Sequence, residues 1–202
     1  MQTIQYNNQS ITPSKVICVG RNYVEHIKEL NNETPDMMVL FNKPNSAITS
    51  KLRYIQEDCR FEGEICFLIK ENKIEGIGFG FDLTKAGIQN KMKEKGLPWE
   101  RAKGFDGSAV LSKFVKFSGN ITSLEMKLTI NGDLVQYATY DLMIYKPNKI
   151  LSEIQTFMTL EDGDIIMSGT PKGVATYQRD DIFEAEIFIE DESILKEVFI
   201  AY

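Results

Sequence analysis

Two glutamates carry the first sign of chemistry in this sequence. Glu62 and Glu64 lie in the stretch 61–65 (Phe-Glu-Gly-Glu-Ile), which runs directly into the apolar residues 66–69. Side chains alternate across a strand, so both carboxylates are expected to project from the same face. Burying two like charges without a partner is costly, and a divalent cation would remove that cost. Ligands that are all oxygen favour Mg²⁺, Ca²⁺ or Mn²⁺ over zinc.

A third carboxylate, Asp82, closes the next β-like run. If residues 71–73 form the loop between the two strands, Asp82 lies opposite Glu62 and Gly80 lies opposite Glu64. All three acids then share one face, beside a glycine that leaves room. A slip of one residue would move Asp82 to the other face. This register predicts a metal site, and the alternative is a solvated edge of a half-exposed strand.

Three further features could contribute groups for proton transfer or anion binding. His26, the single histidine of the chain, precedes Glu29 by three residues, so on a helix the pair shares one face and could take a proton from water. Lys103 could stabilise an enolate or alkoxide. The turn at 169–171 could present N–H groups and a hydroxyl to a carboxylate. The alternatives are a surface ion pair, an exposed lysine and an ordinary turn.

Short strands and a few helices must position these residues. The pattern of apolar residues predicts strands over 15–19, 38–41, 61–69, 74–81, 127–130, 134–137, 165–167, 183–189 and 195–200. It predicts helices over 23–30, 84–95 and 150–158, with Asn22 and Thr84 as N-caps of the first two. Asn131-Gly132 is a strong hairpin signal. We therefore expect an α+β fold that is predominantly β, with short helices as covers.

Composition and charge limit the classes of function. The chain has 202 residues, of which 43% are hydrophobic and 26% charged, as in an ordinary globular domain. We expect one domain over 1–202, with 1–14 as a short lead-in. The formal net charge of −6 argues against nucleic acid as a partner. The most basic stretch, 91–101, also contains Glu94 and Glu100 and is interpreted as a solvated helix face.

Several common sites and segments are missing from the sequence. Cys18, Cys59 and Cys66 form no CxxC pair, which favours free thiols in a reduced, cytoplasmic compartment. The first residues lack the basic start and apolar segment of a signal peptide, and no apolar run approaches the roughly 18 residues of a membrane span. No GxGxxG, GxxxxGK[ST] or GxSxG motif occurs. We therefore expect no membrane partner and no dinucleotide, P-loop or serine-hydrolase site.

An ordered series of short motifs resembles the fumarylacetoacetate hydrolase family. The motifs are, in chain order, Gly20-Arg21-Asn22-Tyr23 followed by His26 and Glu29, Phe41-Asn42-Lys43-Pro44-Asn45-Ser46-Ala47, Glu62-Gly63-Glu64, Gly80-Phe81-Asp82-Leu83-Thr84, Gly96-Leu97-Pro98-Trp99, Ala102-Lys103-Gly104-Phe105-Asp106 and Ser168-Gly169-Thr170-Pro171-Lys172-Gly173-Val174. The length resembles single-domain members of the acylpyruvate hydrolase and oxaloacetate decarboxylase type. The resemblance implies a mixed β-roll or β-sandwich of the family's C-terminal type, a homodimer, and Mg²⁺ or Mn²⁺ in the site.

The resemblance also implies roles for individual residues. Glu62, Glu64 and Asp82 would be the metal ligands. His26 and Glu29 would be the acid/base dyad, and Lys103 would stabilise the substrate oxyanion. The substrate would be a small 2-oxo acid, contacted by Gln89 and Thr170.

One position departs from the family pattern. Relatives carry Arg-Asp where this chain has Ala86-Gly87, so a cation that would help hold the substrate is missing. Arg21 and Lys43 are candidates for its replacement.

The implied reaction passes through a metal-stabilised enolate. It is C–C hydrolysis of acylpyruvates, in which His26 and Glu29 activate water, or decarboxylation of oxaloacetate. The first alternative is an isomerase or tautomerase of 2-oxo or 2-hydroxy-dienoate acids. The second is a 2-oxo acid binding protein with little turnover.

Overall fold

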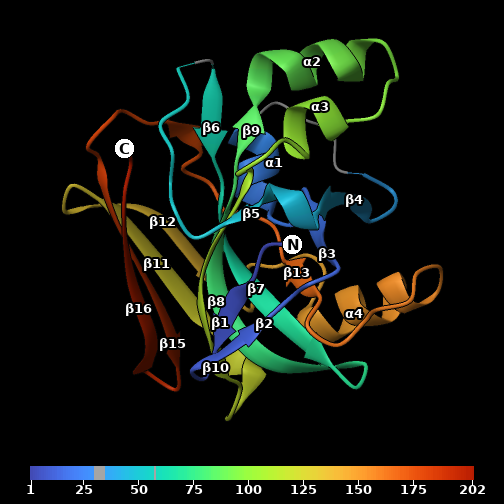
Figure 1. The fold of residues 1–202 in the computed structure, drawn as a ribbon, viewed down its shortest axis with the longest axis vertical. Coiled ribbons are helices and arrows are strands. Elements are labelled where there is room, and N and C mark those ends of the chain that lie inside the picture. The colour runs from blue at the N-terminus through green and yellow to red at the C-terminus, as the bar shows by residue number, and fades with distance from the viewer. Residues whose placement is uncertain (30–34, 57) are drawn as a thin grey trace.

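A mixed β-sheet forms the centre of the molecule. The structure is a computed structural model that describes residues 1–29, 35–56 and 58–202. In these residues the large sheet has nine strands. Across the sheet they are β2 (Gln9–Ile11), β1 (Ile4–Tyr6), β10 (Ala109–Lys116), β8 (Lys73–Asp82), β7 (Gly63–Lys70), β13 (Ile165–Met167), β3 (Lys15–Gly20) and β4 (Val39–Pro44), with β5 (Ile48–Thr49) paired to β10. The sheet is strongly curved, so strands in different parts of it run in different directions in Figure 1.

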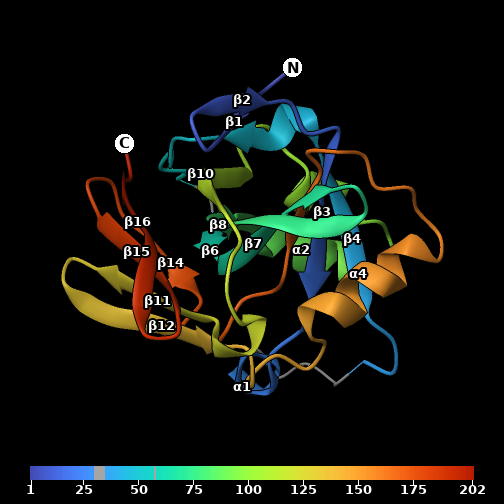
Figure 2. The same cartoon turned by 90° about the horizontal axis from the view of Figure 1, so that it is seen from below.

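Two smaller sheets complete the β structure. The first is antiparallel, in the order β12 (Asp133–Thr139), β11 (Glu125–Ile130), β15 (Ile182–Ile189) and β16 (Glu192–Ile200). The second contains β14 (Ala175–Thr176), β6 (Cys59–Phe61) and β9 (Thr84–Lys85). The antiparallel sheet forms a layer of its own on one side of the molecule in Figures 1 and 2. The expectation of a mostly β fold with covering helices is confirmed.

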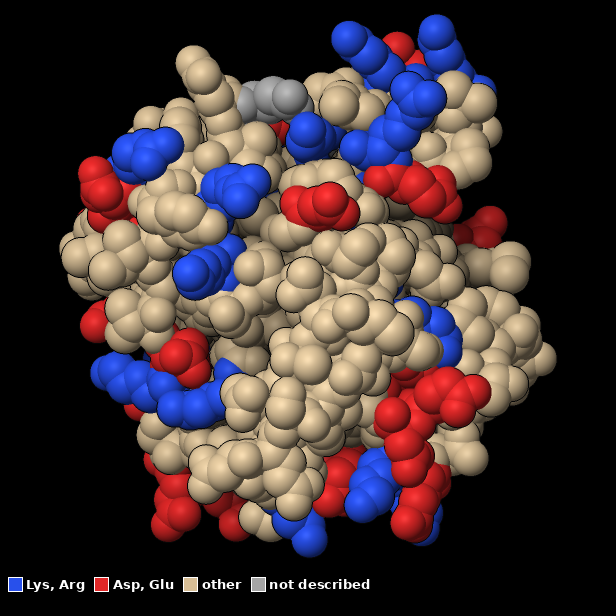
Figure 3. All heavy atoms as spheres, viewed as in Figure 1, with Lys and Arg blue, Asp and Glu red and all other residues tan. Residues whose placement is uncertain are grey.

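The helices lie at the periphery. They are α1 (Val24–Glu29), α2 (Ala86–Glu94), α3 (Glu100–Lys103) and α4 (Pro147–Gln155), with 3₁₀ turns at Asn45–Ala47 and Ile121–Ser123. Lys and Arg side chains gather around α2 and α3 in Figure 3. Lys91 on α2, Lys95 just after it and Arg101 on α3 are exposed, as the solvated-face interpretation predicts. None of the helices in the described residues is long and apolar enough to cross a membrane.

The β7–β8 hairpin separates two apolar clusters. Phe79 and Phe81 point toward the four-stranded sheet, where Phe81 stacks edge-on with Phe183 and packs against Phe199, each at 5.2 Å. Burying each such ring contributes about 1.5–3 kcal/mol. Cys66 and its neighbours on the opposite face pack with β3 and β13 in a second cluster. The alternation of side chains therefore places a core on both faces, and the acidic residues share the face of Cys66.

The register of this hairpin is the one that the sequence predicts. Glu64 pairs with Gly80, and the Asp82 N–H donates to the Glu62 carbonyl at 2.9 Å. The turn contains only Glu71 and Asn72, both with positive φ (49° and 59°), instead of the three residues expected. An irregularity between Leu68 and Ile69 restores the predicted pairing further along the strands.

Other expected elements need correction. The strand β10, which pairs with β8 in the centre of the sheet, is not among the predicted strands. The segment expected as a lead-in contains the hairpin β1–β2, whose strand β1 pairs with β10. The helix α3, which carries Lys103, is also not predicted. The strand expected over 38–41 continues to Pro44, and the last helix begins at Pro147 and ends at Gln155. The end of the helix predicted over 23–30 lies outside the described residues.

Candidate functional site

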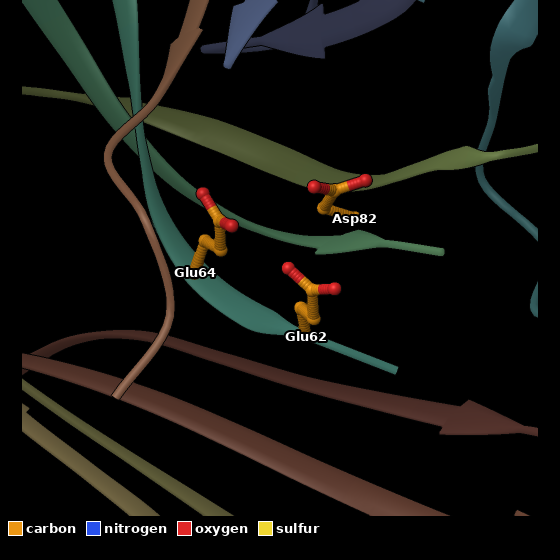
Figure 4. A group of neighbouring side chains, drawn as sticks. All are labelled: Glu62, Glu64 and Asp82. Carbon is orange, nitrogen blue, oxygen red and sulfur yellow. The ribbon is translucent and has the colours of Figure 1, made fainter. Parts of the chain in front are cut away.

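Three carboxylates converge at the open end of the β7–β8 hairpin. Glu62 directly precedes β7, Glu64 lies within it, and Asp82 ends β8. One oxygen from each lies within 4.8 Å of the others, and all three side chains project from the same side of the hairpin in Figure 4. Glu64 and Asp82 are each 1% exposed. Glycine is required at position 80 because apolar side chains pack against it: a Cβ there would lie 2.8 Å from Cys66 Sγ and 2.9 Å from Leu111 Cδ2.

Two buried lysines lie against these acids. Lys103 Nζ lies 2.6 Å from Asp82 Oδ2 and 3.0 Å from Glu62 Oε1. Lys43 Nζ lies 2.7 Å from Asp82 Oδ1 and donates to the backbone carbonyls of Lys103 and Leu83. Burial lowers the pKa of Lys103, but Asp82 and Glu62 raise it by more, so this ammonium remains charged.

The pKa values of the two glutamates move in opposite directions. Burial, with the charges of Asp82 and Glu62, raises the pKa of Glu64 well above its ordinary value. Burial also raises the pKa of Glu62, but Lys103, the nearby His26 and a hydrogen bond from Thr84 lower it by more. The Glu62 carboxylate is therefore held charged, while Glu64 forms no ion pair with any of the described residues.

The loop after β13 supplies a backbone donor to Glu64. The Gly169 N–H donates to Glu64 Oε2 at 2.6 Å, and Ser168 Oγ donates to the Ile65 carbonyl at 2.8 Å. Gly169 has a φ of +96°, and a Cβ there would lie 2.8 Å from Asn22 Cβ. Glycine is therefore required where this loop passes the carboxylate.

The predicted His26–Glu29 pair forms on α1. His26 is buried, and its Nδ1 lies 3.4 Å from Glu29 Oε2, while Glu29 remains one third exposed (33%). The Gly173 N–H donates to both oxygens of Glu29, at 3.0 and 3.2 Å. The loop 168–173 thus contacts Glu64 through Gly169 and Glu29 through Gly173.

The two predicted N-caps have tertiary roles instead. Thr84 is the first residue of β9, and α2 begins only after Lys85. The Thr84 hydroxyl donates to Glu62 Oε1 at 2.6 Å. Asn22 Nδ2 donates to the Tyr145 and Ser168 carbonyls, at 3.0 and 2.8 Å, and its Oδ1 accepts from the Tyr145 N–H at 2.6 Å. Asn22 therefore attaches the start of α1 to the chain around Tyr145 and to the loop 168–173.

The Thr170 hydroxyl is fully engaged within the protein. It donates to the Gly63 carbonyl at 2.9 Å and accepts from Gln136 Nε2 at 2.8 Å. Its backbone is therefore the part of Thr170 that remains for a ligand. Gln136 was missed in the sequence analysis, because a lone glutamine in a strand carries no local signal.

Gln89 and Arg21 lie nearer the surface, and Lys93 joins them. Gln89 and Lys93 are half-buried and lie four residues apart on α2, so they share one helix face. Burial and the charges of Arg21 and Lys103 lower the pKa of Lys93, which places these cations near one another. Lys93 Nζ also lies 5.4 Å above the ring of Trp99. Ala86, the first residue of α2, is buried.

A cleft of about 420 Å³ adjoins these cations. Its lining residues are Val39, Leu40, Phe41, Asn42, Leu97, Pro98, Trp99, Glu100 and Lys103. Lys103 reaches from this cleft to Asp82 and Glu62, and its ammonium lies 5.1 Å above the Phe41 ring. The Lys103 side chain therefore connects this cleft with the carboxylates.

The carboxylate cluster fits a hard divalent cation. All donors are oxygens, and their separation is within the span of a cation that binds oxygens at about 2.0–2.6 Å. Asp82 Oδ1 is buried and accepts no hydrogen bond from the described residues, although the Lys43 ammonium lies near it. A metal ion bound to this oxygen would share it with the Lys43 ammonium, 2.7 Å away.

Comparisons with known proteins agree with this arrangement. The family model described as fumarylacetoacetate (FAA) hydrolase C-terminal matches residues 15–197. The oxaloacetate tautomerase YcgM of Escherichia coli K12 is 36% identical over 187 residues, covering 83% of this chain and 85% of that protein.

Two solved structures share the fold. A putative fumarylacetoacetate isomerase/hydrolase from Oleispira antarctica has a TM-score of 0.93 and 32% identity, with all of both chains covered. A fumarylpyruvate hydrolase from Pseudomonas aeruginosa, in complex with Mn²⁺ and pyruvate, has a TM-score of 0.84 and 26% identity over 92% of this chain and 91% of that one. The chain therefore belongs to the fumarylacetoacetate hydrolase family.

Proposed function

We propose that the protein is a metal-dependent enzyme that interconverts the keto and enol forms of oxaloacetate or a similar 2-oxo acid. The observation that carries this proposal is the convergence of Glu62, Glu64 and Asp82 beside the buried ammonium of Lys103. The similarity to oxaloacetate tautomerase YcgM supports the choice of reaction.

Glu62, Glu64 and Asp82 would hold Mg²⁺ or Mn²⁺. A divalent cation in such a site supplies Lewis acidity, which favours the enolate of a 2-oxo acid. The complex of the related fumarylpyruvate hydrolase with Mn²⁺ and pyruvate supports both the cation and the class of ligand.

Lys103 and the dyad would carry the charge and the proton. The Lys103 ammonium is fixed by Asp82 and Glu62, so it is oriented before a substrate arrives and can stabilise a developing oxyanion. His26 would move the proton between carbon and solvent, held in orientation by Glu29, which the Gly173 N–H fixes in turn. Positioned acid–base groups of this kind contribute about 10²–10⁴-fold in rate.

The remaining expected residues would bind the substrate. Gln89 and Arg21 would do so from the α2 side, and Thr170 through its backbone N–H. Lys43 is fully buried against Asp82, so we propose that it acts on the substrate only through that carboxylate. We further propose one catalytic domain over 1–202 and a homodimer.

Hydrolytic C–C cleavage of an acylpyruvate is the second candidate. It is favoured by the exposure of Glu29, which lets water reach the dyad, and by the similarity to fumarylpyruvate hydrolase. Decarboxylation of oxaloacetate would use the same enolate without an activated water.

Proton NMR in D₂O distinguishes these reactions. With Mg²⁺ or Mn²⁺, the tautomerase accelerates the approach to the keto–enol equilibrium of oxaloacetate, and the only change of mass is the gain from exchanged deuterium. Release of CO₂ indicates decarboxylation, and a cleaved acid from acetylpyruvate indicates hydrolysis. The Glu64→Gln variant should lose the activity, and Glu153→Gln on α4 is a matched surface control that should retain it. Equal rates for wild type and Glu64→Gln would contradict the proposal.

A further inference from the structure

The carboxamide of Gln136 is buried between the four-stranded sheet and the acidic hairpin. Gln136 lies on β12 and is 1% exposed. Its Oε1 accepts from the Gly63 N–H at 2.9 Å, and its Nε2 donates to Thr170 Oγ1 at 2.8 Å and to the Pro171 carbonyl at 3.0 Å. The orientation of the amide is fixed, because one end meets a donor and the other meets a carbonyl.

One end of this carboxamide holds the peptide between two proposed metal ligands. Gly63 separates Glu62 from Glu64, so its backbone sets the distance and angle between the two carboxylates. Gly63 is also in contact with the amide: a Cβ added there would lie 2.6 Å from Gln136 Oε1. The backbone of the acidic strand therefore packs directly on Gln136.

The other end holds the loop 168–173. Thr170 accepts from Gln136 and donates its hydroxyl hydrogen to the Gly63 carbonyl, while the Gly63 N–H donates to Gln136. The three residues therefore form a closed ring of hydrogen bonds. The same loop gives the Gly169 N–H to Glu64 and the Gly173 N–H to Glu29. A Cβ at Gly173 would lie 3.1 Å from Gln136 Cγ, so the loop also packs on this side chain.

We propose that Gln136 is a positioning residue that sets the geometry of the cation site from behind the strand. It acts by fixing Gly63 relative to Gly169, and thereby Glu62 relative to Glu64. This inference rests on the proposed function, because it assumes that these carboxylates hold a divalent cation. Partners that orient metal ligands typically change metal affinity by 10–100-fold when they are removed.

The test compares Gln136→Met with Asp164→Asn in the full-length protein. Methionine nearly matches glutamine in length but makes none of the three hydrogen bonds, which leaves the Gly63 N–H unpaired. Asp164 precedes β13 at the end opposite Gly169 and is also buried and hydrogen-bonded, so its variant controls for general loss of stability. The affinity for Mn²⁺ alone is measured by electron paramagnetic resonance, and hydrogen exchange is measured on the metal-free proteins.

Gln136→Met should weaken Mn²⁺ binding by about 10–100-fold. It should also accelerate hydrogen exchange at 62–64 and 169–173, whereas Asp164→Asn should leave the Mn²⁺ dissociation constant within about twofold. An unchanged Mn²⁺ affinity in folded Gln136→Met would overturn the inference and assign Gln136 to stability alone. If Gln136→Met does not fold, Thr170→Val, which breaks the same ring at its second member, must lower the affinity for the inference to stand.

The outcome for wild type separates this inference from the proposed function. If the wild-type protein does not bind Mn²⁺, the proposed cation site is wrong. The exchange at Gly63 in metal-free Gln136→Met then still decides whether the side chain holds this peptide. Exchange equal to wild type would overturn that part as well.

Discussion

Replacing Gly173 by alanine should separate proton transfer from cation binding. Gly173 has a φ of +103°, and an added Cβ would lie well under 3.0 Å from the Val135 carbonyl oxygen, which belongs to the backbone of β12. Neither partner is a flexible side chain, so the loop must move. The Gly173 N–H to Glu29 hydrogen bonds are already 3.0 and 3.2 Å long, and such bonds are lost near 3.6 Å.

The size of the effect follows from this geometry. A displacement of about 1 Å at a catalytic group can lower the rate by about 100-fold. Glu29 would lose its anchor and His26 its orientation, so kcat should fall by about that factor. Gly173 donates to Glu29, whereas Glu64 and Gly63 are held by Gly169 and Thr170 earlier in the same loop. The affinity for Mn²⁺ should therefore fall less than kcat, by at most about tenfold, the smallest effect typical of a disturbed ligand partner. Oxaloacetate ketonisation followed by NMR, with Mn²⁺ binding measured on the same samples, checks both values.

Gly132 provides the matched control. It precedes the same strand and has a φ of +93°, but an added Cβ would meet no atom within 4 Å. Gly132→Ala therefore adds the strain of a left-handed residue, about 1–2 kcal/mol, without a collision. It should lower the thermal midpoint and leave kcat at the wild-type value. A Gly173→Ala enzyme with wild-type kcat would refute the role of this loop in fixing the dyad.

Three further changes test separate parts of the structure. Thr84→Val removes the hydroxyl that donates to Glu62 at 2.6 Å and should weaken Mn²⁺ binding by about tenfold, while Thr84→Ser should restore it; titration with Mn²⁺ measures both. Asp164→Ala removes a carboxylate that accepts from Ser14, Lys15 and the Glu161 N–H, and should lower the free energy of unfolding by about 3 kcal/mol at pH 7. Burial raises the pKa of Asp164, but these hydrogen bonds lower it by more, so the pKa lies below its ordinary value. The stabilisation by Asp164 is therefore complete above about pH 5 and is lost as the pH falls through the folded pKa. Denaturant unfolding should show that the difference in free energy of unfolding between Asp164→Ala and wild type becomes smaller in acid. Lys93→Gln tests whether Lys93 binds the second carboxylate of oxaloacetate. It should raise KM for oxaloacetate, which has two carboxylates, more than it raises the inhibition constant of pyruvate, which has one. Equal changes in the two constants would contradict this role.

The sequence predicts those parts of the site that depend on local geometry. The alternation of side chains and the short connection between β7 and β8 are enough to place Asp82 and Glu64 on one face, and the register is confirmed. The i,i+3 spacing of His26 and Glu29 is confirmed in the same way. In each case the relevant residues belong to one element or to neighbouring strands, so few alternatives compete.

The errors occur where distant segments meet. Asn22 and Thr84 have the residue types of N-caps, but their side chains bind Tyr145 and Glu62 instead, because buried acceptors and donors there would otherwise be unpaired. The strand β10 was missed although it is the neighbour of β8. Gln136 lies 73 residues from Gly63 in sequence, and no local pattern relates them. Such contacts follow from the tertiary fold and not from spacing along the chain.

The balance of charges explains how the site can act without an arginine at position 86. When all three carboxylates are ionised, they exceed the two buried ammoniums, Lys43 and Lys103, by one negative charge. A divalent cation would favour the ionised form of Glu64, whose pKa is raised without it, and would bring the cluster to one net positive charge. The single carboxylate of a 2-oxo acid head neutralises that charge. A second carboxylate, as in oxaloacetate, needs a further cation outside the cluster. Lys93 lies near Arg21 and Lys103, so α2 still supplies positive charge to the site, from a position two turns after the alanine.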